Sequence, residues 1–151
     1  MTLYEILLFV HILGVAVWVG GSIMLGVVSA RIQGTGDAVF RARFARAAGV
    51  VGPVIGISAA LILASGLWMV IDNDAIELSQ LWVWLGLALF LLSGIVGAVY
   101  FAPASNRIVE ALEGGRVEEA DRRAGAFNLV SRLDTLLLVV IVGLMVFKPG
   151  L

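Results

Sequence analysis

The sequence predicts an all-α integral membrane protein, a bundle of four transmembrane helices with both termini on the outer side. Three observations lead to this fold class: the composition, four long apolar stretches, and an uneven distribution of arginine among the connections. Of the 151 residues, 61% are hydrophobic and 14% are charged, whereas a soluble domain has about 45–50% apolar and about 25% charged residues. This composition is typical of a membrane protein.

The charges and the cysteine content exclude several classes of function. Ten Lys and Arg residues stand against eleven Asp and Glu, so the balance favours neither nucleic acid nor an acidic partner. The chain has no cysteine, which excludes disulfides, thiolate metal sites and iron–sulfur clusters. Its length suits one transmembrane domain, residues 1–151. We expect the first apolar run to be a retained helix, because it lacks the cationic start and the short length of a signal peptide.

Four stretches are long enough to cross a hydrocarbon core about 30 Å thick, which needs roughly 20 apolar residues. They cover about 3–28, 48–71, 81–102 and 127–147. Pairs of small residues recur four apart within them and predict close helix–helix contacts. These pairs are Ala16/Gly20, Ser22/Gly26, Gly52/Gly56, Ala60/Ala64 and Ser93/Gly97.

The connections differ in charge. The first, around 30–47, holds four arginines and one aspartate, and the third, around 104–125, holds four arginines among five acids. The second, 72–77, is acidic without a Lys or Arg. Because Lys and Arg stay on the cytoplasmic side, connections one and three should be cytoplasmic and both termini should face outward.

The two predicted cytoplasmic connections also carry helical signals. Phe40, Phe44 and Ala47 have helical spacing, so the first connection should extend the second helix. In the third, Gly114-Gly115 should break the helix in two, and Glu119 with Arg123 forms an i,i+4 pair in the favourable order.

Ionisable residues occur inside the predicted spans. At about 1.5 Å per residue, His11 lies roughly 12 Å and Trp18 roughly 22 Å from the outer edge, with Asp134 and Arg132 at roughly 20 and 22 Å. Such groups are costly in a bilayer and persist when they are paired or functional. Arg132 and Asp134 are two residues apart, so they cannot face the same neighbour. Three interpretations stay open: snorkelling of Arg132 to the surface, a structural polar network that includes Asp134, and a cofactor or substrate role.

His11 is the only histidine in the chain and shares a helix face with Gly14 and Trp18. The glycine leaves room for something flat or bulky. A neutral imidazole can bind haem iron, copper or zinc, or it can be a hydrogen-bonded core residue. A haem held by two histidines would need a second chain.

One signature is specific to a known group. His11-Ile12-Leu13 followed by Trp18-Val19-Gly20-Gly21, within four spans and a basic first connection, resembles small bacterial membrane proteins. The group includes the copper-resistance protein D domain, the membrane protoporphyrinogen IX oxidase, and an uncharacterised integral-membrane family that looks closest over the whole chain. The resemblance implies the inner (plasma) membrane of a bacterium and a haem- or porphyrin-binding histidine, carried over to His11.

The sequence also departs from the oxidase pattern. The oxidase pairs its histidine with a lysine on the third helix, and residues 81–102 contain no lysine or arginine. A further histidine at the end of the first helix is replaced by Ser29-Ala30-Arg31. These departures leave enzymatic activity undecided.

Two functional hypotheses follow. In the first, His11 binds the iron of a haem b or porphyrin, Trp18 packs near it, and Arg132 or a second copy of the chain holds the propionates or the second axial position. In the second, the protein is a non-catalytic accessory subunit that docks onto a larger membrane complex without a cofactor. Transport is the weakest alternative, because no discontinuous helix or midplane carboxylate cluster is evident. The expected partners are the lipid bilayer and a second copy or a membrane complex.

Overall fold

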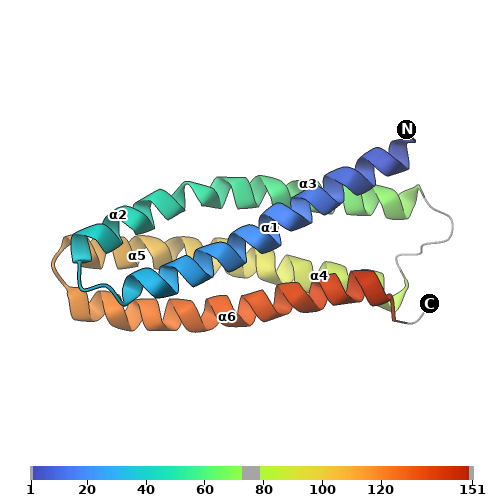
Figure 1. Ribbon diagram of the computed structural model, residues 1–151. Coiled ribbons are helices and arrows are strands. Elements are labelled where there is room, and N and C mark those ends of the chain that lie inside the picture. Colours follow the sequence, from blue (N-terminus) through green and yellow to red (C-terminus); the bar gives the residue numbers. More distant parts are fainter. Residues whose placement is uncertain (1, 73–78, 150–151) are drawn as a thin grey trace.

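The computed structural model describes residues 2–72 and 79–149, and 90% of the described residues are helical, with no strand among them. The helices are α1 (Leu3–Gln33), α2 (Ala38–Gly49), α3 (Val51–Ile71), α4 (Leu81–Val96), the π-helical turn η1 (Gly97–Phe101), α5 (Ala102–Glu113) and α6 (Val117–Phe147). They run lengthwise as one elongated bundle (Figure 1). The predicted all-α fold is confirmed.

Four helical rods are long and apolar enough to cross a membrane: Leu3–Gln33, Ala38–Ile71, Leu81–Glu113 and Val117–Phe147. Each has 31 to 34 residues, about 46–51 Å at the α-helical rise, so each exceeds a hydrocarbon core of about 30 Å. The excess over the predicted spans lies at the end opposite the termini (Figure 1). This end, called the arginine-rich end below, holds α2, α5 and the start of α6.

The local predictions for the connections are confirmed. The first connection continues the second rod as α2, which Asp37 begins by accepting a hydrogen bond from the Phe40 N–H at 3.0 Å. The Gly114-Gly115 break separates α5 from α6, and Gly115 has φ +70°, a conformation that glycine adopts without strain. Arg123 contacts Glu119 at 2.7 Å, four residues earlier on α6.

The π-helical turn η1 was not predicted. It lies directly before Pro103, near the start of α5. A proline inside a helix lacks an N–H and its ring clashes with the carbonyl four residues earlier. A wider π turn relieves that clash without ending the rod, so the third span and α5 form one continuous rod.

Two apolar clusters hold the bundle together. The transmembrane core consists of Trp18, Ile62, Phe90, Leu138 and Ile141 and draws on α1, α3, α4 and α6. The end core lies at the arginine-rich end, where α2, α5 and α6 bury Ala42, Ile108, Ala111, Leu112, Ala120 and Ala124. The rods therefore continue beyond the membrane span into a second packed region.

Most of the predicted small-residue contacts are wrong within the single chain. Six members of those pairs are exposed: Ala16, Gly20, Gly52, Gly56, Ala60 and Ala64. Ser93 is buried, and a Cβ added at Gly26 would lie 3.3 Å from Ser131 Oγ. The spacing of small residues identifies a narrow helix face but does not say which neighbour that face meets. On α1 the face that meets α3 is centred on Gly14. A Cβ added there would lie 2.9 Å from Ile62 Cγ1 and 3.3 Å from the Ser58 carbonyl oxygen.

We predict that Gly14→Leu weakens the bundle, because the larger side chain must displace Ile62 and meets the α3 backbone. The free energy of unfolding should fall by about 1–3 kcal/mol, the usual cost of overpacking. Reversible unfolding in mixed detergent, followed by circular dichroism, measures this. Gly20→Leu is the matched control, since a Cβ there meets nothing within 4 Å. An equal loss in both variants would contradict the assigned α1–α3 contact.

Candidate functional site

The position of His11 follows from where α1 begins. Thr2 and Glu5 form a capping box: the Glu5 N–H donates to Thr2 Oγ1 at 3.3 Å and the Thr2 N–H donates to Glu5 Oε2 at 2.8 Å. Such a box fixes the first turn of a helix. His11 then lies on the α1 face that packs against α3, together with Gly14. The room beside His11 that the sequence suggested for a bulky group is occupied by Ile62 of α3.

The His11 ring is held by two oxygen atoms of α3. Its Nδ1 lies 3.0 Å from the Ile62 carbonyl oxygen and 3.1 Å from Ser65 Oγ. A carbonyl oxygen can only accept, and the Ser65 hydroxyl donates to the Leu61 carbonyl oxygen at 2.5 Å. Nδ1 therefore carries the proton and donates, and the lone pair of the neutral ring lies on Nε2.

The other side of the ring is close to α3 but not sealed. A Cβ added at Gly66 would lie 3.0 Å from His11 Cε1, so the glycine makes space for the ring. Within the described part of the chain, Arg41 Nε is the only fully buried side-chain polar atom without a partner. His11 is partly exposed, and its Nε2, which has no recorded hydrogen bond, is not fully buried.

Trp18 packs behind the same α3 segment. Its side chain is buried in the transmembrane core with Ile62, the residue whose carbonyl accepts the His11 proton. Its ring meets Phe90 of α4 edge to face, with centroids 4.6 Å apart. Trp18 thus faces the interior of the bundle, and no recorded contact joins it to His11 among the described residues.

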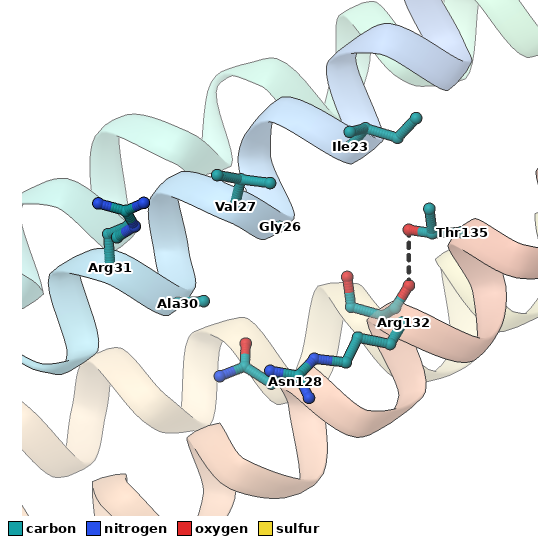
Figure 2. A pocket seen from close by; sticks show the side chains of 9 residues that line it. Ile23, Gly26, Val27, Ala30, Arg31, Asn128, Arg132 and Thr135 are labelled. Carbon is teal, nitrogen blue, oxygen red and sulfur yellow. Dashed lines mark hydrogen bonds between the residues drawn. The ribbon is translucent and has the colours of Figure 1, made fainter.

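Asp134 and Arg132 face different neighbours, as their spacing predicts. Asp134 Oδ1 accepts a hydrogen bond from the buried Ser93 hydroxyl of α4 at 2.7 Å. Arg132 is exposed and lines an open groove between α6 and α1. Figure 2 shows its side chain running toward Asn128, which lies nearer the arginine-rich end. No contact joins either residue to His11 in the described structure.

Comparison with known proteins places this architecture in a family. Residues 5–149 match the family described as "Predicted integral membrane protein (DUF2269)". The chain belongs to the DUF2269 family. No curated protein and no solved structure matches it. Membership supports a membrane-embedded protein, which implies contact with lipid, while the resemblance to the copper-resistance and oxidase proteins stays a prediction.

The donor set of this DUF2269 member restricts the metal chemistry. Among the described residues no group of three or more His, Asp or Glu side chains could hold a metal ion. A bare zinc or copper ion takes three or four protein ligands. Within the described residues, His11 is therefore not part of such a ligand group.

One ion pair of the DUF2269 fold was not predicted from the sequence. Arg41 of α2 is only 6% exposed, and its Nη2 lies 2.5 Å from Asp121 Oδ1 of α6. The two residues are 80 positions apart, so no local spacing could pair them. The sequence used Arg41 only for membrane orientation, but it also ties α2 to α6 beside the end core.

We predict that Ser93→Ala removes support from Asp134, because the carboxyl loses its recorded donor inside the span. The free energy of unfolding should fall by about 0.6–1.7 kcal/mol, the range of interhelical hydrogen bonds in membranes. A double-mutant cycle with Asp134→Ala, which removes the acceptor, should show coupling, with the two losses less than additive. Thr135→Ala serves as a control, since that hydroxyl bonds the Ser131 carbonyl of its own helix. Strict additivity would contradict the pair.

Proposed function

We propose that the protein is a haem- or porphyrin-binding membrane protein in which His11 Nε2 is an axial ligand. The observation that carries this proposal is the bond from His11 Nδ1–H to the Ile62 carbonyl oxygen at 3.0 Å. Metal-ligating histidines usually donate their other ring N–H to a carbonyl or carboxylate, which fixes the tautomer and makes the ligating nitrogen more basic. His11 has this arrangement, and its Nε2 is not fully buried.

The chemistry of the donor set favours a porphyrin over a bare metal ion. Among the described residues His11 has no cluster of other ligands beside it, and a single imidazole is too little for an isolated cation. A metalloporphyrin supplies four nitrogen ligands itself and needs only one or two from the protein. Bound haem b would supply one-electron redox chemistry, and this chain's residues would fix the axial imidazole and its basicity.

The residues around His11 suit this role to different degrees. Trp18 and Ile62 belong to one buried cluster, which anchors the α3 segment whose carbonyl oxygen faces His11. Arg132 lines a groove in which Ile23 is the α1 residue nearest to His11 in sequence. Ile23 lies about 18 Å further along α1 than His11 by helical rise. The proposal for His11 therefore does not depend on Arg132. A haem with two imidazole ligands requires a second copy, because each chain has one histidine.

An accessory-subunit role is the second candidate, and a specific observation favours it. The pairs Ala16/Gly20, Gly52/Gly56 and Ala60/Ala64 are all exposed. Faces of small residues let another transmembrane helix approach closely. A partner membrane protein could pack on these faces with no cofactor in either chain.

We predict that the purified protein, reconstituted with haem, shows a Soret band that shifts on dithionite reduction. His11→Ala should abolish the band, because the axial nitrogen is lost, and added imidazole should restore it. His11→Gln is the matched variant that keeps a polar side chain of similar size but supplies no imidazole ligand. Circular dichroism verifies that each variant is folded.

Two further readings complete the test. One haem per two chains indicates two His11 ligands, and one per chain indicates a single axial imidazole. A featureless spectrum of the folded, haem-loaded wild type overturns the proposal. Co-purification of a stable membrane partner would then favour the accessory-subunit role.

We also propose that the arginine-rich end faces the cytoplasm of a bacterial cell. The support is the arginine in connections one and three together with its absence from the acidic second connection. The end core and the Arg41–Asp121 pair lie on that side.

Cysteine labelling tests this orientation directly, because the chain has no cysteine of its own. Gly36→Cys lies at the arginine-rich end and Asp72→Cys at the opposite end, and both positions are exposed. In intact spheroplasts a membrane-impermeant maleimide should label Asp72→Cys and leave Gly36→Cys unmodified until the membrane is permeabilised. The reverse pattern would show that the chain has the opposite topology.

A further inference from the structure

An open groove separates α1 from α6 near the arginine-rich end. Its volume is about 510 Å³, within the range of about 300–1,000 Å³ found for small-molecule sites. Figure 2 shows Ala30 on the side of α1 that faces α6, the Arg132 side chain running along α6 toward Asn128, and the Arg31 guanidinium turned away from α6. The lining residues are Ile23, Gly26, Val27, Ala30 and Arg31 on α1, and Asn128, Ser131, Arg132 and Thr135 on α6.

The groove is amphipathic along its length. Ile23 and Val27 give it an apolar wall toward the membrane interior. Gly26 has no side chain to occupy the space beside Ser131. Toward the arginine-rich end the lining becomes polar, and there Asn128 Nδ2 donates to Gln33 Oε1 at 2.6 Å across the two helices. A ligand that fits must be apolar at one end and polar at the other.

The polar part of the groove is cationic and lacks a counter-charge. Arg31 and Arg132 both line it, and none of the nine lining residues is acidic. Neither guanidinium has a recorded carboxylate partner within residues 2–72 and 79–149. Four other arginines near this end are paired with acids, in Arg41–Asp121, Arg46–Glu113, Arg116–Glu119 and Arg123–Glu119. Arg43, Arg107 and Arg122 have no recorded carboxylate partner among the described residues either, but they lie outside the groove.

The groove also lies at the level where the apolar spans give way to the end core. Arg31 is in the last turn of α1, just past the predicted end of the first span. Arg132 is exposed on α6, five residues after Phe127, which packs against the end core. At this level a bilayer places lipid phosphates beside the first segments of the acyl chains.

We propose that this groove binds an anionic phospholipid, with the phosphate at Arg132, the Arg31 side chain turned toward it on binding, and one acyl chain along Ile23 and Val27. Guanidinium groups bind phosphate oxygens through charge-assisted hydrogen bonds, and basic pockets between transmembrane helices are sites for acidic headgroups. The groove is open on its side, so a lipid enters from the bilayer without crossing the bundle.

The test uses the full-length protein in neutral detergent and native mass spectrometry with added phosphatidylglycerol or phosphatidylcholine. The wild type should retain phosphatidylglycerol preferentially. The double variant Arg31→Gln/Arg132→Gln should weaken that binding about tenfold or more, given about 1 kcal/mol for each basic side chain at an anionic lipid surface. Ile23→Trp places a larger side chain in the apolar part of the groove and keeps both arginines. It should weaken phosphatidylglycerol binding as well.

Arg107→Gln/Arg122→Gln is the matched control, since it removes the same charge from two exposed arginines outside the groove. It should leave the preference for phosphatidylglycerol unchanged. The proposal is overturned if this control weakens binding as much as the groove variant, or if the groove variant retains the lipid like the wild type. Equal competition by glycerol phosphate, which lacks acyl chains, would assign the site to a free phosphate ester rather than to a lipid.

Discussion

The close approach of α1 to α3 at Gly14 is the contact on which the rest of the structure depends. An added Cβ at Gly14 would meet Ile62 and the Ser58 carbonyl oxygen, so only glycine lets the two helices come this near. At that separation His11 Nδ1 reaches the Ile62 carbonyl oxygen. One turn further along, the same approach lets Trp18 fill the centre of the bundle against Ile62 and Phe90. A larger residue at position 14 would disturb packing and the orientation of the imidazole together.

The course of α1 also explains why the groove lies where it does. This helix packs mainly on α3 near the termini and lies beside α6 toward the arginine-rich end (Figure 1). Beyond Gly26, whose added Cβ would approach Ser131, the facing side chains are Val27 and Ala30, which are too short to fill the space. At this end α2 and α5 pack their own core with α6, and α1 contributes no buried residue to it. The groove is therefore a consequence of helix direction combined with short side chains.

The sequence could predict the architecture because each span had to bury its backbone polar groups within a helix, and only apolar stretches of sufficient length could do so. The helix continuing through Phe40 and Phe44 and the break at Gly114-Gly115 were predictable for a similar reason, since both depend on local chemistry. The direction of each helix face was not. The Ala16/Gly20 and Ser93/Gly97 pairs carry the same four-residue spacing, yet Ala16 and Gly20 are exposed and Ser93 is buried.

The candidate site shows the same division between local and tertiary information. That Arg132 and Asp134 face different ways follows from helical geometry, and depth estimates placed His11 in the outer half of the first span. The partners could not be read in advance, because Ile62 is 51 residues from His11 and Ser93 is 41 from Asp134. Pairing across such separations is decided by which helices adjoin, and four antiparallel spans can be ordered in more than one way.

The polar groups inside the bundle each use a different neighbour. His11 donates to α3, Asp134 accepts from α4, and Arg132 lies in the groove facing α1. Asp134 accepts one short hydrogen bond at Oδ1, which suits a role in holding α4 to α6. The Nε2 of His11 and the guanidinium of Arg132 have no recorded partner within the described chain, so both retain binding capacity that packing does not consume. In a bilayer, where unused polar capacity is costly, binding of another molecule at either residue would recover part of that cost.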